Sequence, residues 1–239
     1  MPLPQIVTPS YELTLPSTEQ KIDFRPFLVK EEKLLVLAME TEDTKEITKA
    51  VKTVIKNCIQ TKGIKVEDLP TFDIEYLFLN IRGKSVGEEV EVNIICPDDN
   101  ETQVPVSIDL EEIQVKKDPK HSTKIKVDDS IMIEMKYPSL EQFVKSNFDL
   151  KGGSQMDQSF ELIASCIDKI YTTEEVWAAE DCTKQEIVDF LESMNSTQFK
   201  GIESFFETMP KLSHEIKVKN PKTGKSSMVV LEGLASFFA

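Results

Sequence analysis

The apolar residues of this chain change their spacing from segment to segment, and this change most constrains the fold. In short stretches they alternate with polar residues, as Val90, Val92 and Ile94 do, which is the pattern of a half-buried β-strand. In the stretches between, they recur every three or four residues, which is typical of an amphipathic helix. The alternating stretches come in pairs joined by turn residues. The sequence therefore predicts antiparallel hairpins mixed with helices, an α+β fold.

The predicted strands fall into four pairs. They occupy residues 10–25, 90–108, 124–135 and 215–231. The helices between them are indicated by their periodicity and by capping residues, such as Thr183 with Glu186 three positions later. They are expected at residues 28–39, 43–63, 71–81, from 138 onward, 160–170, 183–194 and 202–209. Gly83 and Gly87 are expected to bracket a loop, and residues 114–122 to form a linker.

The two halves of the chain resemble each other. Arg25-Pro26-Phe27 precedes the first helix of one half, and Tyr137-Pro138-Ser139 precedes a helix of the other. Each half also ends in a hairpin whose return strand runs into Leu-Glu-x-aliphatic. We expect two lobes, residues 1–117 and 118–239, each made of helices and small antiparallel hairpins. An ancestral duplication and a chance recurrence of capped helices after strand pairs explain the likeness equally well.

The charge of the chain argues against nucleic acid as a partner. Its 239 residues include 28 Lys and Arg against 42 Asp and Glu, a net charge of −14. Only Arg25 and Arg82 are arginines, although arginine is the preferred residue for phosphate and base contacts. Both are expected to serve as structural ion-pair or capping residues. The acidic surface favours solubility and basic partners.

Membrane and export classes are also disfavoured by the sequence. The longest apolar runs, such as residues 34–39, are much shorter than the roughly 20 residues that a membrane helix needs. No signal-peptide pattern opens the chain, so we expect it to fold in a cytosol. The four cysteines are widely spaced and are expected to be free thiols.

The motifs of the common enzyme classes are missing from the sequence. His121 and His214 have no metal-ligand spacing around them, and the glycines form no phosphate-binding loop. Asp98 and Asp99 lie in the densest cluster of oxygen ligands, which is either a plain solvated turn or a weak Ca²⁺ site. We therefore predict no catalytic residue, no cofactor and no metal site. A site assembled in space from Asp98, Asp99 and His214 is the enzymatic alternative.

Large apolar residues near acidic or terminal segments are the candidates for partner binding. Trp177, the single tryptophan, lies between acidic residues and is either a core residue or an interface anchor. Leu234, Phe237 and Phe238 lie near the end of the chain and dock either on their own domain or on a partner. The sequence thus predicts a binding or assembly role rather than catalysis.

Three segments carry a resemblance to a known family. They are residues 25–40, residues 72–88, and residues 229–234 with Phe237 and Phe238. From Tyr11 to Phe238 the chain resembles the baseplate hub protein family of T-even-type tailed bacteriophages. The resemblance implies a non-enzymatic protein of contractile-tail morphogenesis whose partners are other hub or tape-measure proteins.

The resemblance leaves two roles open. The first is an assembly factor, chaperone-like, that works on the hub in the host cytoplasm. The second is a permanent structural subunit in the baseplate of the virion tail. Some relatives carry cysteine pairs in hairpins, in the manner of a zinc ribbon. Here the first hairpin keeps only Cys96 and the second has no cysteine, so zinc is not expected.

Overall fold

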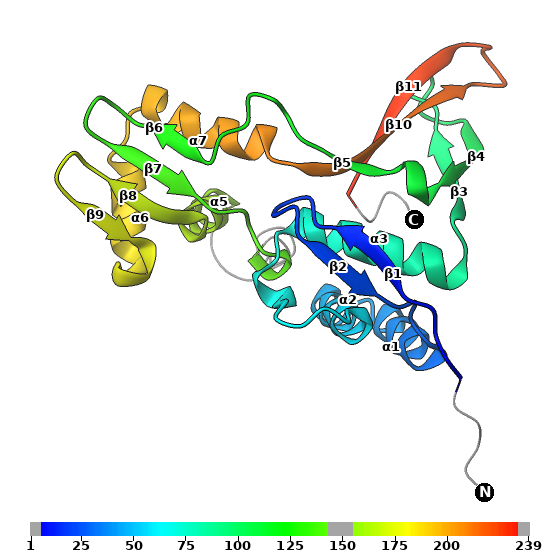
Figure 1. Ribbon diagram of the computed structural model, residues 1–239. Coiled ribbons are helices and arrows are strands. Elements are labelled where there is room, and N and C mark those ends of the chain that lie inside the picture. The colour runs from blue at the N-terminus through cyan, green and yellow to red at the C-terminus, as the bar shows by residue number, and fades with distance from the viewer. Residues whose placement is uncertain (1–5, 143–154, 234–239) are drawn as a thin grey trace, which may run out of the picture. The chain divides into compact units, whose positions relative to one another are not determined.

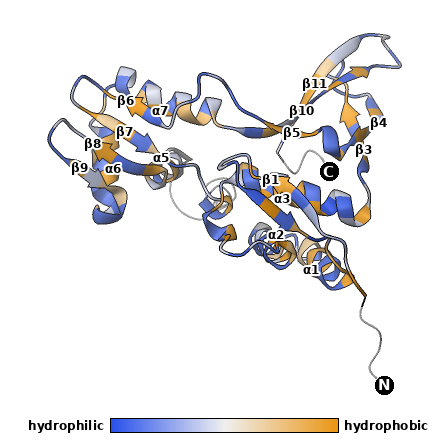
Figure 2. Cartoon of the chain, viewed as in Figure 1, coloured by the Kyte–Doolittle hydropathy of each residue, from blue (hydrophilic) through white to orange (hydrophobic). Residues whose placement is uncertain are grey.

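The computed structural model describes residues 6–142 and 155–233, which form helices and small antiparallel sheets (Figure 1). The mixed α+β class predicted from the sequence is confirmed. Contacts divide the chain into two compact units. Unit 1 combines Met1–Lys116 with Lys211–Ala239, and unit 2 is Lys117–Pro210. Figure 2 shows that hydrophobic residues are distributed over both units, and each unit has a core of its own.

Unit 1 begins with a two-stranded ribbon followed by helices. Its elements are β1 (Tyr11–Thr14), β2 (Lys21–Phe24), α1 (Val29–Glu40), α2 (Thr44–Cys58), η1 (Val66–Asp68) and α3 (Thr71–Val86). Asp43 caps α2, because its side chain accepts a hydrogen bond from the Lys45 N–H at 2.8 Å. The helix ends at Cys58, before the predicted end at Gly63. The next residue, Ile59, takes an extended backbone and bridges to Phe24 of β2.

The last turns of α3 correct a second expectation. The loop predicted between Gly83 and Gly87 is helical up to Val86. Gly83 lies in the helix, and a Cβ at that position would only reach ordinary contact with Leu110. Gly87 ends the helix with a φ of 126°, in the region that favours glycine. Much of α3 is buried, because its apolar residues occupy a wide face of the helix.

Arg25 and Glu31 fix the start of α1. The Arg25 Nη2 lies 3.1 Å from the Glu31 Oε1, and the Glu31 side chain is 1% exposed. Glu31 also accepts the Leu28 N–H at 2.9 Å, and Arg25 donates to the Pro26 carbonyl at 2.9 Å. The structural ion pair expected for Arg25 is confirmed.

The second part of unit 1 consists of hairpins. Its elements are β3 (Glu89–Ile95), β4 (Gln103–Asp109), η2 (Leu110–Glu112), β5 (Gln114–Lys116), β10 (Lys211–Lys219) and β11 (Ser226–Glu232). The strands β3 and β4 form a two-stranded sheet, whereas a second sheet has the order β11-β10-β5. Leu79 of α3 packs with Ile94, Ile108, Leu212 and Val218 of these strands in one core.

The prediction that residues 114–122 form a linker is wrong in part, because β5 pairs with β10. Residues 114–116 are a strand in which Val115 lies opposite Leu212, so only the rest of the segment can link. A three-residue strand with one apolar side chain is too short for its alternation to show in sequence. Through this pairing the terminal hairpin belongs to unit 1, whereas the predicted lobes, 1–117 and 118–239, assign it to the second half. The internal duplication stays a prediction.

Unit 2 is built on one four-stranded antiparallel sheet. The strands β6 (Lys124–Lys126), β7 (Met132–Met135), β8 (Ile167–Tyr171) and β9 (Val176–Ala178) are neighbours in this order. The other elements are α5 (Gln155–Ser165), η3 (Ala179–Asp181), α6 (Lys184–Glu192) and α7 (Ser196–Thr208). The register aligns Ile125, Ile133, Ile170 and Trp177 in one row across the sheet.

Two helix predictions in unit 2 have different outcomes. The helix expected to carry Phe160 through Ile170 ends at Ser165, because Ile167–Tyr171 pairs with β7 as β8. Burial of Ile167 between sheet and helices outweighs the helical spacing of its neighbours. The helix expected from residue 138 onward starts with a capping box, since the Ser139 N–H donates to the Gln142 Oε1 at 2.8 Å. The continuation of that helix lies outside the described residues.

Candidate partner-binding groove

Trp177 lies on β9, at the edge of the unit 2 sheet. It is the last residue of the cross-strand row that starts at Ile125, and it pairs directly with Ile170. Exposure rises from Ile133, which is fully buried, to Trp177, of which 41% is accessible. The structure therefore does not place Trp177 in the core. A half-exposed tryptophan on an edge strand is available for contact with another molecule.

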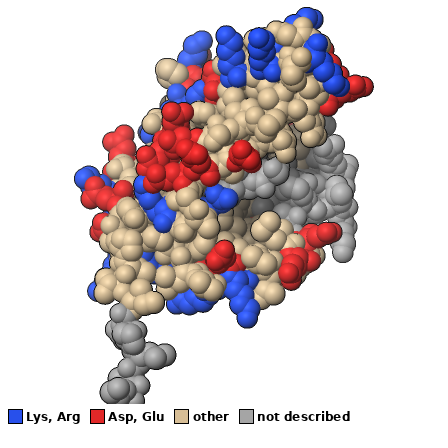
Figure 3. All heavy atoms as spheres, turned by 90° about the vertical axis from the view of Figure 1, so that its right-hand side faces the viewer, with Lys and Arg blue, Asp and Glu red and all other residues tan. Residues whose placement is uncertain are grey.

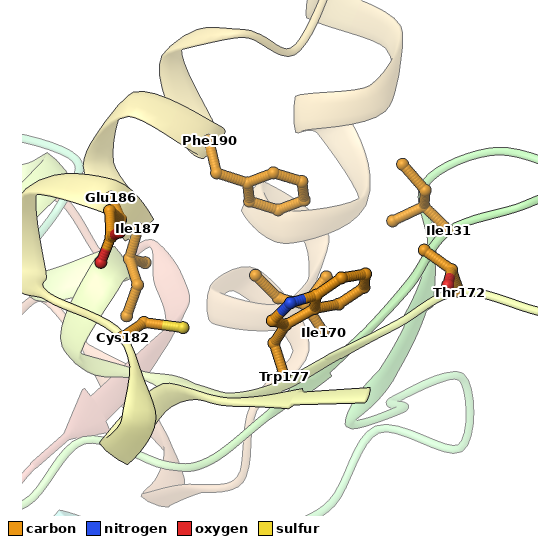
Figure 4. A pocket seen from close by; sticks show the side chains of 8 residues that line it. All are labelled: Ile131, Ile170, Thr172, Trp177, Cys182, Glu186, Ile187 and Phe190. Atoms are coloured by element: carbon orange, nitrogen blue, oxygen red, sulfur yellow. The ribbon is translucent and has the colours of Figure 1, made fainter. Parts of the chain in front are cut away.

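A groove with a volume of about 270 Å³ opens beside Trp177 (Figure 4). We call it the Trp177 groove. It is lined by Ile131, Ile170, Thr172, Trp177, Cys182, Glu186, Ile187 and Phe190. In Figure 4 the rings of Trp177 and Phe190 lie across from each other, and Ile170 lies close to Trp177. The lining is almost entirely apolar, so the groove accepts an apolar side chain rather than a charged ligand.

The local sequence explains how α6 supplies one wall of the Trp177 groove. Thr183 and Glu186 form a reciprocal capping box, in which the Glu186 carboxylate accepts the Thr183 N–H at 2.7 Å. This fixes the first turn of α6, and Ile187 and Phe190 then follow three residues apart on one helix face. The hydrogen bonds from Thr183 lower the pKa of Glu186, which is therefore anionic at neutral pH.

The chain segment that supplies six of the eight residues lining the Trp177 groove is acidic. Between Tyr171 and Glu192 the one basic residue is Lys184. The acidic residues of the same segment are Glu174, Glu175, Glu180, Asp181, Glu186, Asp189 and Glu192, all exposed. We call these seven residues the acidic rim, and an apolar groove in so acidic a segment is complementary to an apolar residue flanked by basic ones.

The other predicted contact residues cannot be compared with Trp177. Leu234, Phe237 and Phe238 lie outside the described residues. The sequence pointed to Trp177 by its composition and flanking charges, but it gave no sign that Phe190 and Cys182 lie beside it. Phe190 and Cys182 lie beside Trp177 because the short helix η3 connects β9 to α6.

His121 is part of a structural cluster, not a reactive one. Its Nδ1 lies 3.0 Å from the Thr208 hydroxyl, and its Nε2 lies 3.0 Å from the Tyr137 hydroxyl. The ring also packs against Tyr137 and Phe205. Burial lowers the pKa of His121, so the ring is neutral near pH 7. Sequence reasoning placed His121 in a linker and missed this cluster.

Asp98 and Asp99 hold two hairpin ends of unit 1 together. The Asn220 Nδ2 donates to both carboxylates at 2.9 Å, and Thr223 donates to Asp98. Hydrogen bonds lower the pKa of both acids, those of Asp98 coming from Thr223 and Asn220. His214 lies on β10 well before Asn220, about 20 Å away along the strand at the usual rise per residue. This separation removes the enzymatic site imagined from Asp98, Asp99 and His214.

Charges are segregated on the surface that Figure 3 shows. Lys and Arg side chains gather along the top of this view, and a group of Asp and Glu side chains lies lower down. The exposed residues of β10 and its turn include Lys217, Lys219, Lys222 and Lys225. These lysines are spread along β10 and the turn that follows it.

Metal-binding and membrane-spanning features are missing from the described ranges. Within residues 6–142 and 155–233, no group of three or more His, Cys, Asp and Glu side chains could hold a metal ion. The four cysteines are free, and burial raises the pKa of the Cys58 and Cys166 thiols to about 11. No helix in the same ranges is long and apolar enough to cross a membrane.

The fold is thus α+β with small antiparallel sheets, and unit 2 carries an apolar groove. The model of the family described as T4 bacteriophage base plate protein matches residues 8–239. The chain therefore belongs to this baseplate family, which implies a role in the phage baseplate and other baseplate proteins as partners. The chain matches no curated protein and no solved structure.

Proposed function

We propose that the protein acts without catalysis as an assembly factor for the baseplate hub, in the host cytoplasm. Its partners are other hub proteins or the tape-measure protein. The observation that supports this proposal is the Trp177 groove, an apolar site with an acidic rim on a member of the baseplate family. The proposal goes beyond the family match, which leaves the hub and the chaperone-like role open.

The groove has the properties of a site for one anchoring side chain. Trp177 and Phe190 provide aromatic walls, and tryptophan is enriched among residues that dominate binding energy. A partner segment with one apolar residue between lysines or arginines would fill the groove and pair with the acidic rim. Because the rim is exposed, its charges affect the association rate and its salt dependence more than the affinity.

A pull-down from infected cells tests the proposed function. The tagged wild-type chain is expected to recover hub or tape-measure proteins. Trp177→Ala is expected to reduce that recovery about tenfold, the size of effect that a hot-spot residue commonly has. Val176→Ala is the matched control, since Val176 is exposed on the same strand but points to the opposite face of the sheet. Failure of the wild type to recover any tail protein would refute the proposal.

A permanent hub subunit is the second candidate function, favoured by the family match to a baseplate protein. Mass spectrometry of purified virions separates the two roles. An assembly factor is expected to be missing from particles, whereas a permanent subunit is present in stoichiometric amount. We further propose Leu234, Phe237 and Phe238 as a second partner contact, which substitution of both phenylalanines by serine in the same pull-down would test.

A further inference from the structure

Helix α1 exposes apolar residues that most helices bury. Of its residues only Glu31 is buried, whereas Val29 is 80% exposed, Met39 62%, Leu37 51% and Val36 50%. The neighbouring helix α2 behaves in the opposite way, since its apolar residues are turned into the core. Exposed apolar residues that gather on one helix are a common mark of an interaction surface. The outward face of α1 therefore has the composition of an interface.

The arrangement of this face follows from helix geometry. At 100° per residue, Val29, Lys33, Val36 and Glu40 fall within a sector of about 60°, which is opposite Glu31. Because Glu31 points to Arg25 in the interior, this sector faces away from the rest of unit 1. We call these four residues, with Leu37 beside them, the outer face of α1. It carries one positive charge in its first half and one negative charge in its second half.

We propose that two copies of the protein associate through the outer face of α1, with the two helices antiparallel. A two-fold axis between Val36 and Leu37 places each Lys33 opposite the partner's Glu40, because the two residues are equally far from that point. A parallel pairing would instead bring Lys33 against Lys33 and Glu40 against Glu40.

The charges on this face are free to make that contact. In the ranges that the structure describes, Lys33 and Glu40 take part in no ion pair, and both are exposed. The apolar residues between them supply the attraction, and the paired charges set the direction. A helix of 12 residues is about 18 Å long, so the contact is small and a micromolar dissociation constant is expected. The association does not depend on the Trp177 groove or on the proposed function.

Sedimentation velocity of the full chain at low ionic strength, over a range of concentrations, tests the proposal. The wild type is expected to form dimers as its concentration passes through the micromolar range. Lys33→Glu and Glu40→Lys each replace two attractive contacts by two repulsive ones across the two-fold axis. Each is expected to weaken dimerisation about tenfold, whereas the double variant restores it to near the wild-type value.

Two further variants make the result specific to α1. Val36→Asp is expected to abolish the dimer while the circular dichroism of the chain is unchanged, since Val36 is half exposed in the single chain. Lys217→Glu on β10 is the charge control and is expected to leave dimerisation unaffected. A wild type that stays monomeric at about a hundred times that dissociation constant would overturn the proposal. So would a double charge variant that associates no better than either single one.

Discussion

Replacing Glu31 with glutamine would remove the negative charge at the start of α1 while keeping the shape of the side chain. The substitution leaves the Arg25 guanidinium, which is 14% exposed, without its carboxylate partner. The glutamine can still accept the Leu28 N–H, so the cap of the helix is retained. The expected loss thus reports on the ion pair rather than on capping.

The structure sets the size of this loss. Breaking a buried ion pair by removing one partner commonly costs about 3–5 kcal/mol. Arg25 keeps its hydrogen bond to the Pro26 carbonyl and some access to water, which reduces the cost to about 2–3 kcal/mol for Glu31→Gln. Arg25→Met is expected to cost a similar amount. The double variant should cost clearly less than the two single variants together, because it leaves no buried charge unpaired.

Urea unfolding followed by circular dichroism measures these free energies, since the helices of unit 1 contribute to the circular dichroism signal. Trp177 fluorescence is the internal control, because the single tryptophan lies in unit 2 and is expected to report an unchanged transition. A coupling energy below about 0.5 kcal/mol in the double-mutant cycle would refute the idea that the pair acts as a unit. An equal loss of stability in unit 2, reported by Trp177 fluorescence, would also refute it.

Three further predictions concern other parts of the molecule. Gly201→Ala should destabilise unit 2 by about 1–3 kcal/mol in thermal unfolding, because the new Cβ would lie 2.7 Å from the Ile125 Cγ2; an unchanged melting temperature would contradict this. Burial lowers the pKa of His121, so its contribution to stability is complete above its ordinary value of 6.5 and is lost as the pH falls through the folded value. The melting temperature of unit 2, followed by Trp177 fluorescence, should therefore decrease in the wild type as the pH drops below 6.5, and it should decrease less in His121→Asn. Asn220→Ala should lower the unfolding free energy of unit 1 by about 1–3 kcal/mol in urea, since the buried amide joins two hairpin ends. Stability equal to that of the wild type would show that the hydrogen bonds of Asn220 to Asp98 and Asp99 are dispensable.

Local signals in the sequence predicted local structure well. The hairpin of β3 and β4 and the capped starts of α2 and α6 follow from alternation and capping residues. These features depend on neighbours within a few positions. Predictions became wrong where a distant segment decides the outcome. Ile167 leaves the helical pattern because β7 pairs with it, and Val115 becomes a strand residue because β10 returns after the whole of unit 2.

The candidate site was likewise predicted only in part by the sequence. Flanking acids and rarity identified Trp177 as a residue of interest, but the sequence favoured neither the core nor an interface strongly enough to decide. Its exposure is decided by its place at the end of a cross-strand row, on an edge strand. The sequence also gave no indication that one side of α1 is exposed, because its apolar spacing predicts a helix without showing how many of its sides are covered.

The order of the two units along the chain also has a consequence for synthesis on the ribosome. Leu79, Ile94 and Ile108 are covered by β10, which is translated only after all of residues 117–210. At bacterial-like elongation speeds that interval lasts roughly 5–20 s. During this time unit 2 can complete its fold, while the first part of unit 1 waits with apolar side chains uncovered. The nascent chain is therefore most vulnerable to aggregation before its final hairpin emerges, and slowing translation within unit 2 would prolong that exposure.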